Sequence, residues 1–163
     1  GALCVALSFM LSYIKLFSLP MGGSLTLCSM LPIAAYACAF GPLYGFVAGL
    51  AFGMLQLIQD FYVIHWAQLL LDYFFAFACY GIAAYFPNKL TLGIAVAGLC
   101  RMLCSTLSGG IFFADSAVDA GWSNAWLYSL AYNGSTIGAE TVLCVLVSLL
   151  PPVKKVLGLM KSE

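Results

Sequence analysis

Residues 68–77 read QLLLDYFFAF and place Asp72 inside an unbroken apolar stretch. A carboxylate near the centre of a membrane helix costs about 2.5 to 3.5 kcal/mol even on the most lenient insertion scales. Such a group is usually retained because it has a partner or a function. Either a cationic residue elsewhere in the chain or a bound ligand is therefore expected to interact with Asp72.

The composition is that of an integral membrane protein. Of the 163 residues, 64% are hydrophobic and 7% are charged, and the mean hydropathy is +1.05. Soluble domains carry about 25% charged residues. A formal net charge of zero without a basic run gives no sign of a nucleic-acid-binding protein. At about 20 residues a span, residues 1–163 allow about six crossings in a single domain.

Helix-breaking residues divide the chain into six apolar segments. The breaks are PMGGS at 20–24, GP at 41–42, QDFYVIH at 59–65, PNK at 87–89, DSAVDAGWSN at 115–124 and PP at 151–152. The sequence thus predicts an all-α bundle of six transmembrane helices, at about residues 2–18, 25–40, 43–58, 66–86, 90–114 and 125–150. The seven cysteines lack CxxC spacing and are interpreted as small buried residues, with no metal site.

The lysines predict the orientation of the chain. With six spans both termini lie on one side of the membrane, and that side carries Lys89, Lys154, Lys155 and Lys161. By the positive-inside rule this side is the cytoplasm, so we expect a multi-pass plasma-membrane protein with both termini cytoplasmic. The outer loops then carry acidic and aromatic side chains, namely Asp60, Asp115, Asp119, His65, Trp66 and Trp122.

Other polar groups fall inside the predicted spans. In the fifth span, Arg101, Ser105 and Ser108 follow one another at spacings of four and three, which places them on one helix face. In the sixth span, Glu140 follows Asn133 by seven residues and shares its face, and it is either neutral or a partner for Arg101. If Asp72 and Glu140 are both ionised, one negative charge stays uncompensated. A cation from outside the cell would balance it.

An outward-facing pocket is the expected place for that cation. Asp72 lies about six residues from the outer end of its predicted span, which is about 9 Å deep. Aromatic faces and an amide near a spare carboxylate suit a small, flat, positively charged heteroaromatic molecule. The aromatic candidates are Tyr62, Trp66, Tyr73, Phe113, Trp122, Trp126 and Tyr128, and the amide is that of Asn133.

Several motifs resemble those of one family of bacterial vitamin importers. They are GSLTLCSMLPI at 23–33, GLAFGMLQLI at 49–58, VIHWAQLLLDY at 63–73, RMLCSTLSGGIFFA at 101–114 and WLYSLAYNG at 126–134. Over nearly the whole chain the sequence resembles the thiamine-specific substrate-binding subunits of energy-coupling factor transporters. The resemblance implies six helices and an outward-facing thiamine pocket in a chain that is not an enzyme, with no catalytic residues and no cofactor. It also implies docking onto a shared transmembrane coupling subunit driven by two ATPase subunits.

The resemblance also implies roles for single residues. The substrate-binding positions that it implies are Tyr62, Asp72, Tyr73, Arg101, Ser105, Gly109, Phe113, Tyr128 and Asn133, to which we add Trp122 as an aromatic side chain expected at the pocket mouth. Relatives carry histidine at the position of Ser105, and some carry tryptophan at that of Phe113. Ala2 and Ala6 match the small residues, four apart, through which family members dock onto the coupling subunit.

Other functions stay open at this stage. The substrate of such a subunit is alternatively a thiamine precursor or analogue, or another flat vitamin. A stand-alone, proton-coupled thiamine carrier is a further alternative, because Asp72 and Glu140 can each take up a proton. An intramembrane enzyme is disfavoured, because the single histidine, His65, is expected in an outer loop and the acids lie on different helices. The chain has no GxxxxGK[ST] motif, so an ATPase partner would have to supply the energy.

Overall fold

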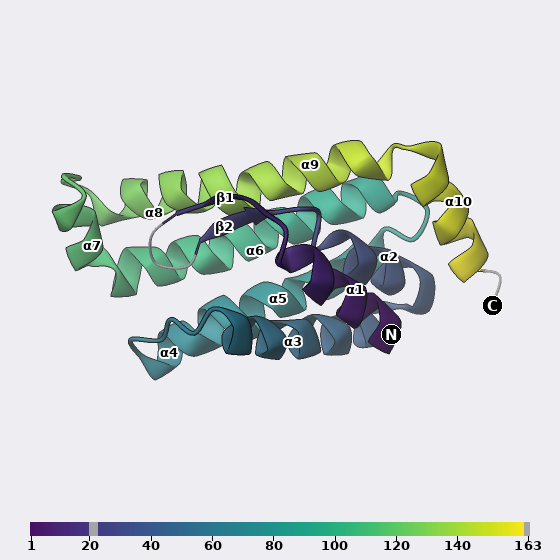
Figure 1. Ribbon diagram of the computed structural model, residues 1–163, viewed down its shortest axis with the longest axis horizontal. Helices are drawn as coiled ribbons and strands as arrows, with labels where there is room; N and C mark the ends of the chain where they lie inside the picture. The colour runs from purple at the N-terminus through teal and green to yellow at the C-terminus, as the bar shows by residue number, and fades with distance from the viewer. Residues whose placement is uncertain (20–22, 162–163) are drawn as a thin grey trace.

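Four long helices run along the longest axis of the molecule, and shorter helices and one β-hairpin complete the fold (Figure 1). The computed structural model describes residues 1–19 and 23–161. The helices that are long and apolar enough to cross a membrane are α3 (Pro42–Gln59), Trp66–Tyr85, α6 (Leu90–Phe112) and Ala125–Ser148. They contain 18, 20, 23 and 24 residues. At 1.5 Å per residue they reach about 27 to 36 Å, which matches a hydrocarbon core of about 30 Å.

Two of these four helices are not uniform α-helices. The Trp66–Tyr85 helix consists of α4 (Trp66–Leu69), the π-helical segment η2 (Leu70–Phe75), α5 (Ala76–Ala78) and the 3-10 segment η3 (Cys79–Tyr85). The Ala125–Ser148 helix consists of α8 (Ala125–Asn133), the π-helical segment η4 (Gly134–Gly138) and α9 (Ala139–Ser148). Single π-helical turns inside a helix are often found at functional sites. Asp72 belongs to the first of them.

The first two predicted spans are shorter than the sequence indicated. Helix α1 is Ala2–Ser12 and helix α2 is Leu31–Phe40, and neither reaches the length of a span. Between them an antiparallel hairpin pairs β1 (Lys15–Ser18) with β2 (Ser24–Thr26). The all-α prediction is therefore wrong at this hairpin, and the prediction of six spans is confirmed for four. Short apolar runs fit a strand as well as a helix, which explains the error.

The predicted breaks have mixed outcomes. Part of the first one, residues 20–22, lies outside the described residues. The fifth break contains a short helix, α7 (Ala114–Asp119), and α10 (Pro151–Met160) begins at the two prolines that were expected only to end the last span. Proline is tolerated in the first turn of a helix, because its missing N–H would have no partner there. The same prolines thus separate α9 from α10 and begin α10.

The long helices turn apolar side chains outward and polar side chains inward. On α6 the outward stripe repeats every four residues, with exposed fractions of 51%, 57%, 44% and 51% for Leu99, Leu103, Leu107 and Ile111. Ser105 and Ser108 on the same helix are buried. Large exposed apolar surfaces mark contact with lipid or with a partner protein. This distribution is that of a membrane protein.

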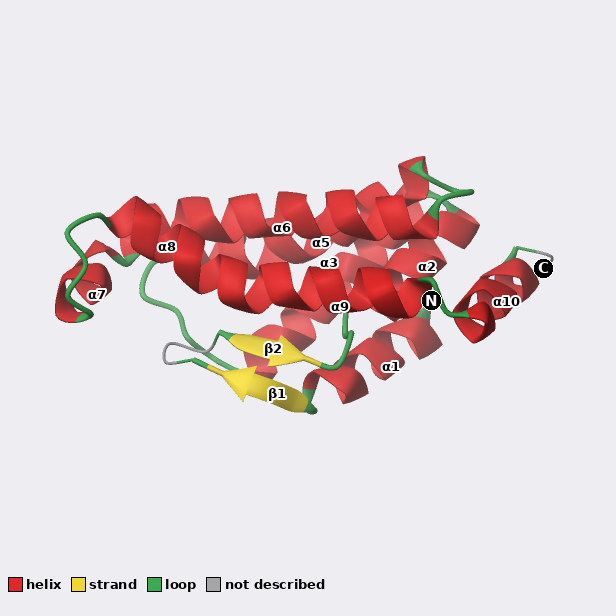
Figure 2. Cartoon of the chain, turned by 90° about the horizontal axis from the view of Figure 1, so that it is seen from above, coloured by secondary structure: helices red, strands yellow, loops and turns green. Residues whose placement is uncertain are grey.

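The two ends of the bundle differ in charge. The start of α1, α10 and the start of α6 lie toward one end, and α4 and α7 lie at the other (Figure 1 and Figure 2). Lys89 caps the start of α6 and Lys154 lies in α10, whereas Asp115 and Asp119 lie in α7. Lysines and acids are thus separated along the bundle.

Glycines allow α3 to touch the Trp66–Tyr85 helix. Gly45, Gly49 and Gly53 repeat every four residues along α3. A Cβ atom at Gly49 would overlap the carbonyl oxygen of Phe77, and one at Gly53 would overlap that of Tyr73. Small residues of this kind let two helix backbones approach closely. The contact holds the helix that carries Asp72 against α3.

We expect Gly49→Ala to lower the free energy of unfolding by about 1 to 3 kcal/mol, because the added methyl group has to push the two helices apart. Gly134→Ala is the matched control, since a Cβ atom there meets no other atom within 4 Å. Thermal unfolding of the detergent-purified protein, followed by circular dichroism, measures both changes. Equal melting temperatures for the two variants would contradict the close helix contact.

Candidate functional site

One cavity lies between the β-hairpin and the long helices. Its walls come from the hairpin, from α3 and the loop that follows it, and from the Trp66–Tyr85, α6 and Ala125–Ser148 helices. Nine of the predicted substrate-binding residues line it, namely Tyr62, Asp72, Tyr73, Arg101, Ser105, Gly109, Phe113, Tyr128 and Asn133. Residues that are far apart in the chain thus meet around one space. Their role in binding a substrate stays a prediction.

Trp122 is the exception, because it is not among the residues that line the cavity. It follows Gly121, which has a φ of +79°, and its N–H donates to the carbonyl oxygen of Ala117 over 2.8 Å. Its ring packs edge-on against Tyr128, with the ring centroids 6.0 Å apart. The turn after α7 therefore holds the ring of Trp122 against Tyr128, a residue of the cavity wall. A place for Trp122 at the mouth of the pocket stays a prediction.

Asp72 reaches the cavity with hydrogen-bond donors beside it but without a cation. Its Oδ2 accepts a hydrogen bond from Gln68 Nε2 at 2.8 Å and another from Ser108 Oγ at 2.8 Å. Within the described residues, the ion pairs are those of Lys15 with Asp60 and of Arg101 with Glu140. Asp72 belongs to neither pair. Hydrogen bonds from neutral groups orient the carboxylate, and no cation of the described residues contacts it directly.

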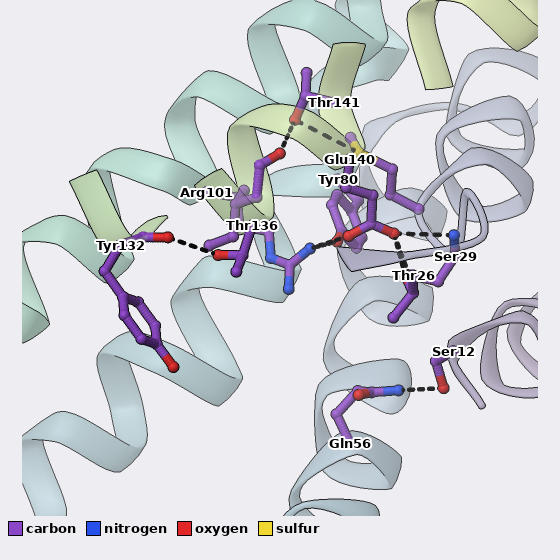
Figure 3. Close-up of polar contacts among 12 residues, drawn as sticks. Ser12, Thr26, Ser29, Gln56, Tyr80, Arg101, Tyr132, Thr136, Glu140 and Thr141 are labelled. Atoms are coloured by element: carbon purple, nitrogen blue, oxygen red, sulfur yellow. Dashed lines mark hydrogen bonds and ion pairs between the residues drawn. The ribbon is translucent and has the colours of Figure 1, made fainter. Parts of the chain in front are cut away.

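Glu140, in contrast, has a cation and three further donors. Its Oε2 lies 3.3 Å from Arg101 Nη1. Its Oε1 accepts from Thr26 Oγ1 at 2.5 Å, from Ser29 Oγ at 2.7 Å and from Ser29 N at 3.0 Å (Figure 3). The side chain is fully buried. The predicted pairing with Arg101 is confirmed, and the charge of Glu140 is neutralised inside the protein.

Arg101 is held from two sides. Its Nη1 also donates to the hydroxyl of Tyr80, and its guanidinium carbon lies 4.5 Å from the centroid of the Phe77 ring and 5.4 Å from that of Tyr80. Aromatic faces attract a guanidinium group electrostatically. With Glu140 opposite, this arginine serves as a structural cation. Among the charged residues that line the cavity, Asp72 is therefore the one without an ion-pair partner in the described part of the chain.

The β-hairpin forms one wall of the cavity. Gly23, Ser24 and Thr26 line it, and the N–H of Gly23 donates to the hydroxyl of Tyr132 over 2.8 Å. Thr26 bonds to Glu140, so the hairpin is tied to the Ala125–Ser148 helix at two levels. In Figure 2 the hairpin lies along one face of the bundle. The sequence predicted helical spans over most of this segment, at residues 2–18 and 25–40, and no part in a binding site.

Aromatic rings and an amide complete the lining. The rings of Tyr62 and Phe113 are stacked, with centroids 5.9 Å apart and an interplanar angle of 21°. The hydroxyl of Tyr73 donates to the carbonyl oxygen of Asp60 over 2.6 Å. Asn133 is buried, and its Nδ2 donates to the carbonyl oxygen of Ser129 over 2.9 Å within its own helix. The cavity therefore offers both cation-attracting faces and fixed hydrogen-bonding groups.

Several lining residues were not assigned from the sequence. They are Gly23, Ser24, Thr26, Ser29, Gln56, Asp60, Gln68, Phe77, Ser129, Tyr132, Thr136, Ile137 and Glu140. Helical spacing in the sequence could have indicated part of this set. Tyr132, Thr136 and Glu140 follow Tyr128 at spacings of four, eight and twelve, close to one helix face. For the hairpin residues no helical periodicity was available.

The fold and the cavity together define a class of protein. A bundle with an apolar outer surface surrounds a cavity lined by aromatic and polar side chains, one of them a carboxylate without an ion pair in the described part of the chain, as in membrane proteins that bind a small molecule. Throughout residues 1–19 and 23–161, no group of three or more His, Cys, Asp or Glu side chains is placed to hold a metal ion.

Comparison with known proteins identifies the family. The family model described as thiamine transporter protein (Thia_YuaJ) matches residues 1–159. The thiamine transporter ThiT of Bacillus subtilis (strain 168) is 31% identical over 147 residues, which cover 80% of this chain and 75% of that protein. The chain belongs to the thiamine transporter protein family. It is accordingly a transporter protein and not an enzyme, as the sequence predicted.

A solved structure supports the same architecture. The structure of ThiT from Listeria monocytogenes matches with a TM-score of 0.75, and the match covers 99% of this chain and 91% of that one. The two sequences are 23% identical, so this likeness concerns the fold.

We expect Glu140→Gln to lower the free energy of unfolding by about 3 to 5 kcal/mol, because it leaves the buried Arg101 without its counter-charge. Asp72→Asn is the matched control, since it makes the same change of carboxylate to amide on the same cavity. It should leave stability unchanged or raise it, because no ion pair is lost. Thermal unfolding without ligand measures both. A lower melting temperature for Asp72→Asn than for Glu140→Gln would reverse the assignment of the two acids.

Proposed function

We propose that this chain is the thiamine-capturing subunit of an energy-coupling factor importer in the bacterial plasma membrane, with both termini cytoplasmic. The observation that carries the proposal is Asp72, a carboxylate without a described ion-pair partner in a cavity of aromatic and amide groups. Membership of the thiamine transporter family supports the choice of ligand. The chain would bind thiamine from outside and deliver it through a coupling subunit driven by two ATPase subunits.

Charge pairing is the main element of the proposed recognition. The thiazolium ring of thiamine carries a fixed positive charge, because its quaternary nitrogen has no proton to lose. Asp72 would supply the counter-charge, with Gln68 and Ser108 holding the carboxylate in position. A pair that is formed out of contact with water is stronger than one on the surface. The thiazolium would thereby offset the free-energy cost of keeping an unpaired carboxylate inside the bundle.

The rest of the lining would select the shape of the ligand. The stacked rings of Tyr62 and Phe113 offer an aromatic surface for a flat cationic ring. Tyr128 and Asn133, both from α8, would bond the polar edge of the aminopyrimidine ring. Ser105 is smaller than the histidine of relatives and would widen the site near Asp72. The same part of the lining would determine whether the alternative ligands, thiamine precursors and analogues, also bind.

Energy coupling would be the task of partner proteins. Ala2 and Ala6 are exposed on α1, so their small side chains leave room for a helix of a coupling subunit. The alternative of a stand-alone proton-coupled carrier is less well supported, because Glu140, one of the two acids it would use, is committed to Arg101 and to the hairpin.

We expect Asp72→Asn to weaken thiamine binding at least about tenfold, because a charge-assisted contact is lost. A neutral analogue, with an uncharged ring in place of the thiazolium, should lose less. Isothermal titration calorimetry of the purified protein measures both ligands. Asp115→Asn removes a carboxylate outside the cavity and serves as the control, which should bind both ligands as the unmodified chain does. Equal losses for the two ligands in Asp72→Asn would remove the charge-pairing argument.

We expect Ala6→Trp to leave thiamine binding intact but to reduce uptake strongly in vesicles that contain the partner subunits and ATP, because the bulky ring blocks helix approach. Val142→Trp on α9 is the control at another exposed position (60%). Normal uptake by Ala6→Trp would count against α1 as the docking helix. Uptake by the isolated chain without ATPase subunits would contradict the coupled mechanism.

A further inference from the structure

A groove lies at the lysine-rich end of the bundle, remote from α7. It is formed where the start of α6, the end of α9 and α10 meet. Its floor is apolar and includes Leu92, Val145, Leu149 and Leu157. Lys89 and Lys154 lie at the same groove, one from the cap of α6 and one from α10. Positive charge and an apolar floor thus occur together at one end of a membrane protein.

The charge of this groove is not balanced by the part of the chain that the structure describes. None of the groove-lining residues is Asp or Glu. The ion pairs found in residues 1–19 and 23–161 involve Lys15 and Arg101, and neither Lys89 nor Lys154 takes part in one. The hydroxyl of Ser148 donates to the carbonyl oxygen of Val145 over 2.7 Å and lies 3.0 Å from that of Thr91, so these two polar groups of the groove are satisfied within the protein. A ligand that complements this surface has to carry negative charge.

The helix that supplies Lys154 is amphipathic. Val153 and Leu157 pack against the hydrophobic core, whereas Lys154 and Lys155 are exposed. Val156 and Leu159 also remain exposed, at 54% and 61%. In Figure 1, α10 lies across the end of the bundle and not along its axis. An amphipathic helix with lysines, set across the end of a spanning bundle, is typical of the membrane interface.

We propose that the groove binds an anionic phospholipid from the surrounding leaflet. Lys89 and Lys154 would contact the phosphate, and an acyl chain would lie against the apolar side chains that line the groove. Lysine-lined pockets between membrane helices on the cytoplasmic side suit anionic headgroups. The apolar floor favours a lipid over a free phosphate ion, because a small anion has no apolar part to cover it. Nothing in this inference depends on which solute the outer cavity binds.

The test titrates the purified full chain in detergent with phosphatidylglycerol or with phosphatidylcholine, and native mass spectrometry counts the lipids that stay bound. We expect phosphatidylglycerol to be retained in preference to phosphatidylcholine. Lys154→Gln should weaken its binding about fivefold, the effect of one lysine close to an anionic surface. Lys155→Gln is the matched control, since it removes the same charge from the next residue, which does not line the groove. It should change the affinity less than twofold.

Two further measurements keep the proposal falsifiable. Ala95→Phe fills the groove without changing any charge and should also reduce retention of phosphatidylglycerol. Thiamine titration of each variant shows that the outer cavity is still folded, and a failure of thiamine to bind the unmodified chain would affect only the proposed function. Equal retention of the two lipids, or equal losses in Lys154→Gln and Lys155→Gln, would overturn the lipid site. Displacement of phosphatidylglycerol by inorganic phosphate would instead show a site for small anions.

Discussion

A charge inside a membrane bundle has to be compensated by another group, and two cavity acids on the long helices, Asp72 and Glu140, meet that requirement differently. Glu140 receives Arg101 and three hydrogen bonds from Thr26 and Ser29. Asp72 receives only neutral donors. The first acid therefore stabilises the fold, while the second keeps a negative charge available on the cavity wall. The assignment of a cationic ligand depends on this difference, because two paired acids would leave an electrically neutral pocket.

The same interactions connect the cavity to the rest of the architecture. Glu140 bonds to Thr26 at the end of the hairpin and pairs with Arg101 of α6, so it connects the two elements. The hydroxyl of Tyr132 accepts a second hydrogen bond from the hairpin, from the N–H of Gly23. Both π-helical segments border the cavity, since η2 carries Asp72 and η4 contributes Thr136 and Ile137. A π-helical turn changes the register of the side chains that follow it, which lets one helix present its polar groups to the cavity and its apolar groups to lipid. The inner wall and the outer surface are thus built from the same helices.

The outer surface is divided along the axis of the bundle. Apolar side chains cover the long helices, acidic residues lie in α7, and lysines lie at the start of α6 and in α10. This division relates the two proposed sites to the membrane. In the proposed arrangement, the cavity would take its ligand from the acidic and aromatic end, and the groove beside α10 would meet the headgroups at the lysine-rich end.

The sequence by itself determined the membrane class, the four long helices, the polar face of α6 and the isolated acid, because hydropathy and helical periodicity are local properties of the chain. Its motifs also indicated the family and nine of the residues that line the cavity. Only the tertiary structure decided that residues 15–18 and 24–26 pair as strands, since a short apolar run is compatible with strand and helix alike. It also decided that Arg101 pairs with Glu140 and that Trp122 packs against Tyr128. Which groups meet across helices depends on how the helix faces are turned toward one another, and no single segment contains that information.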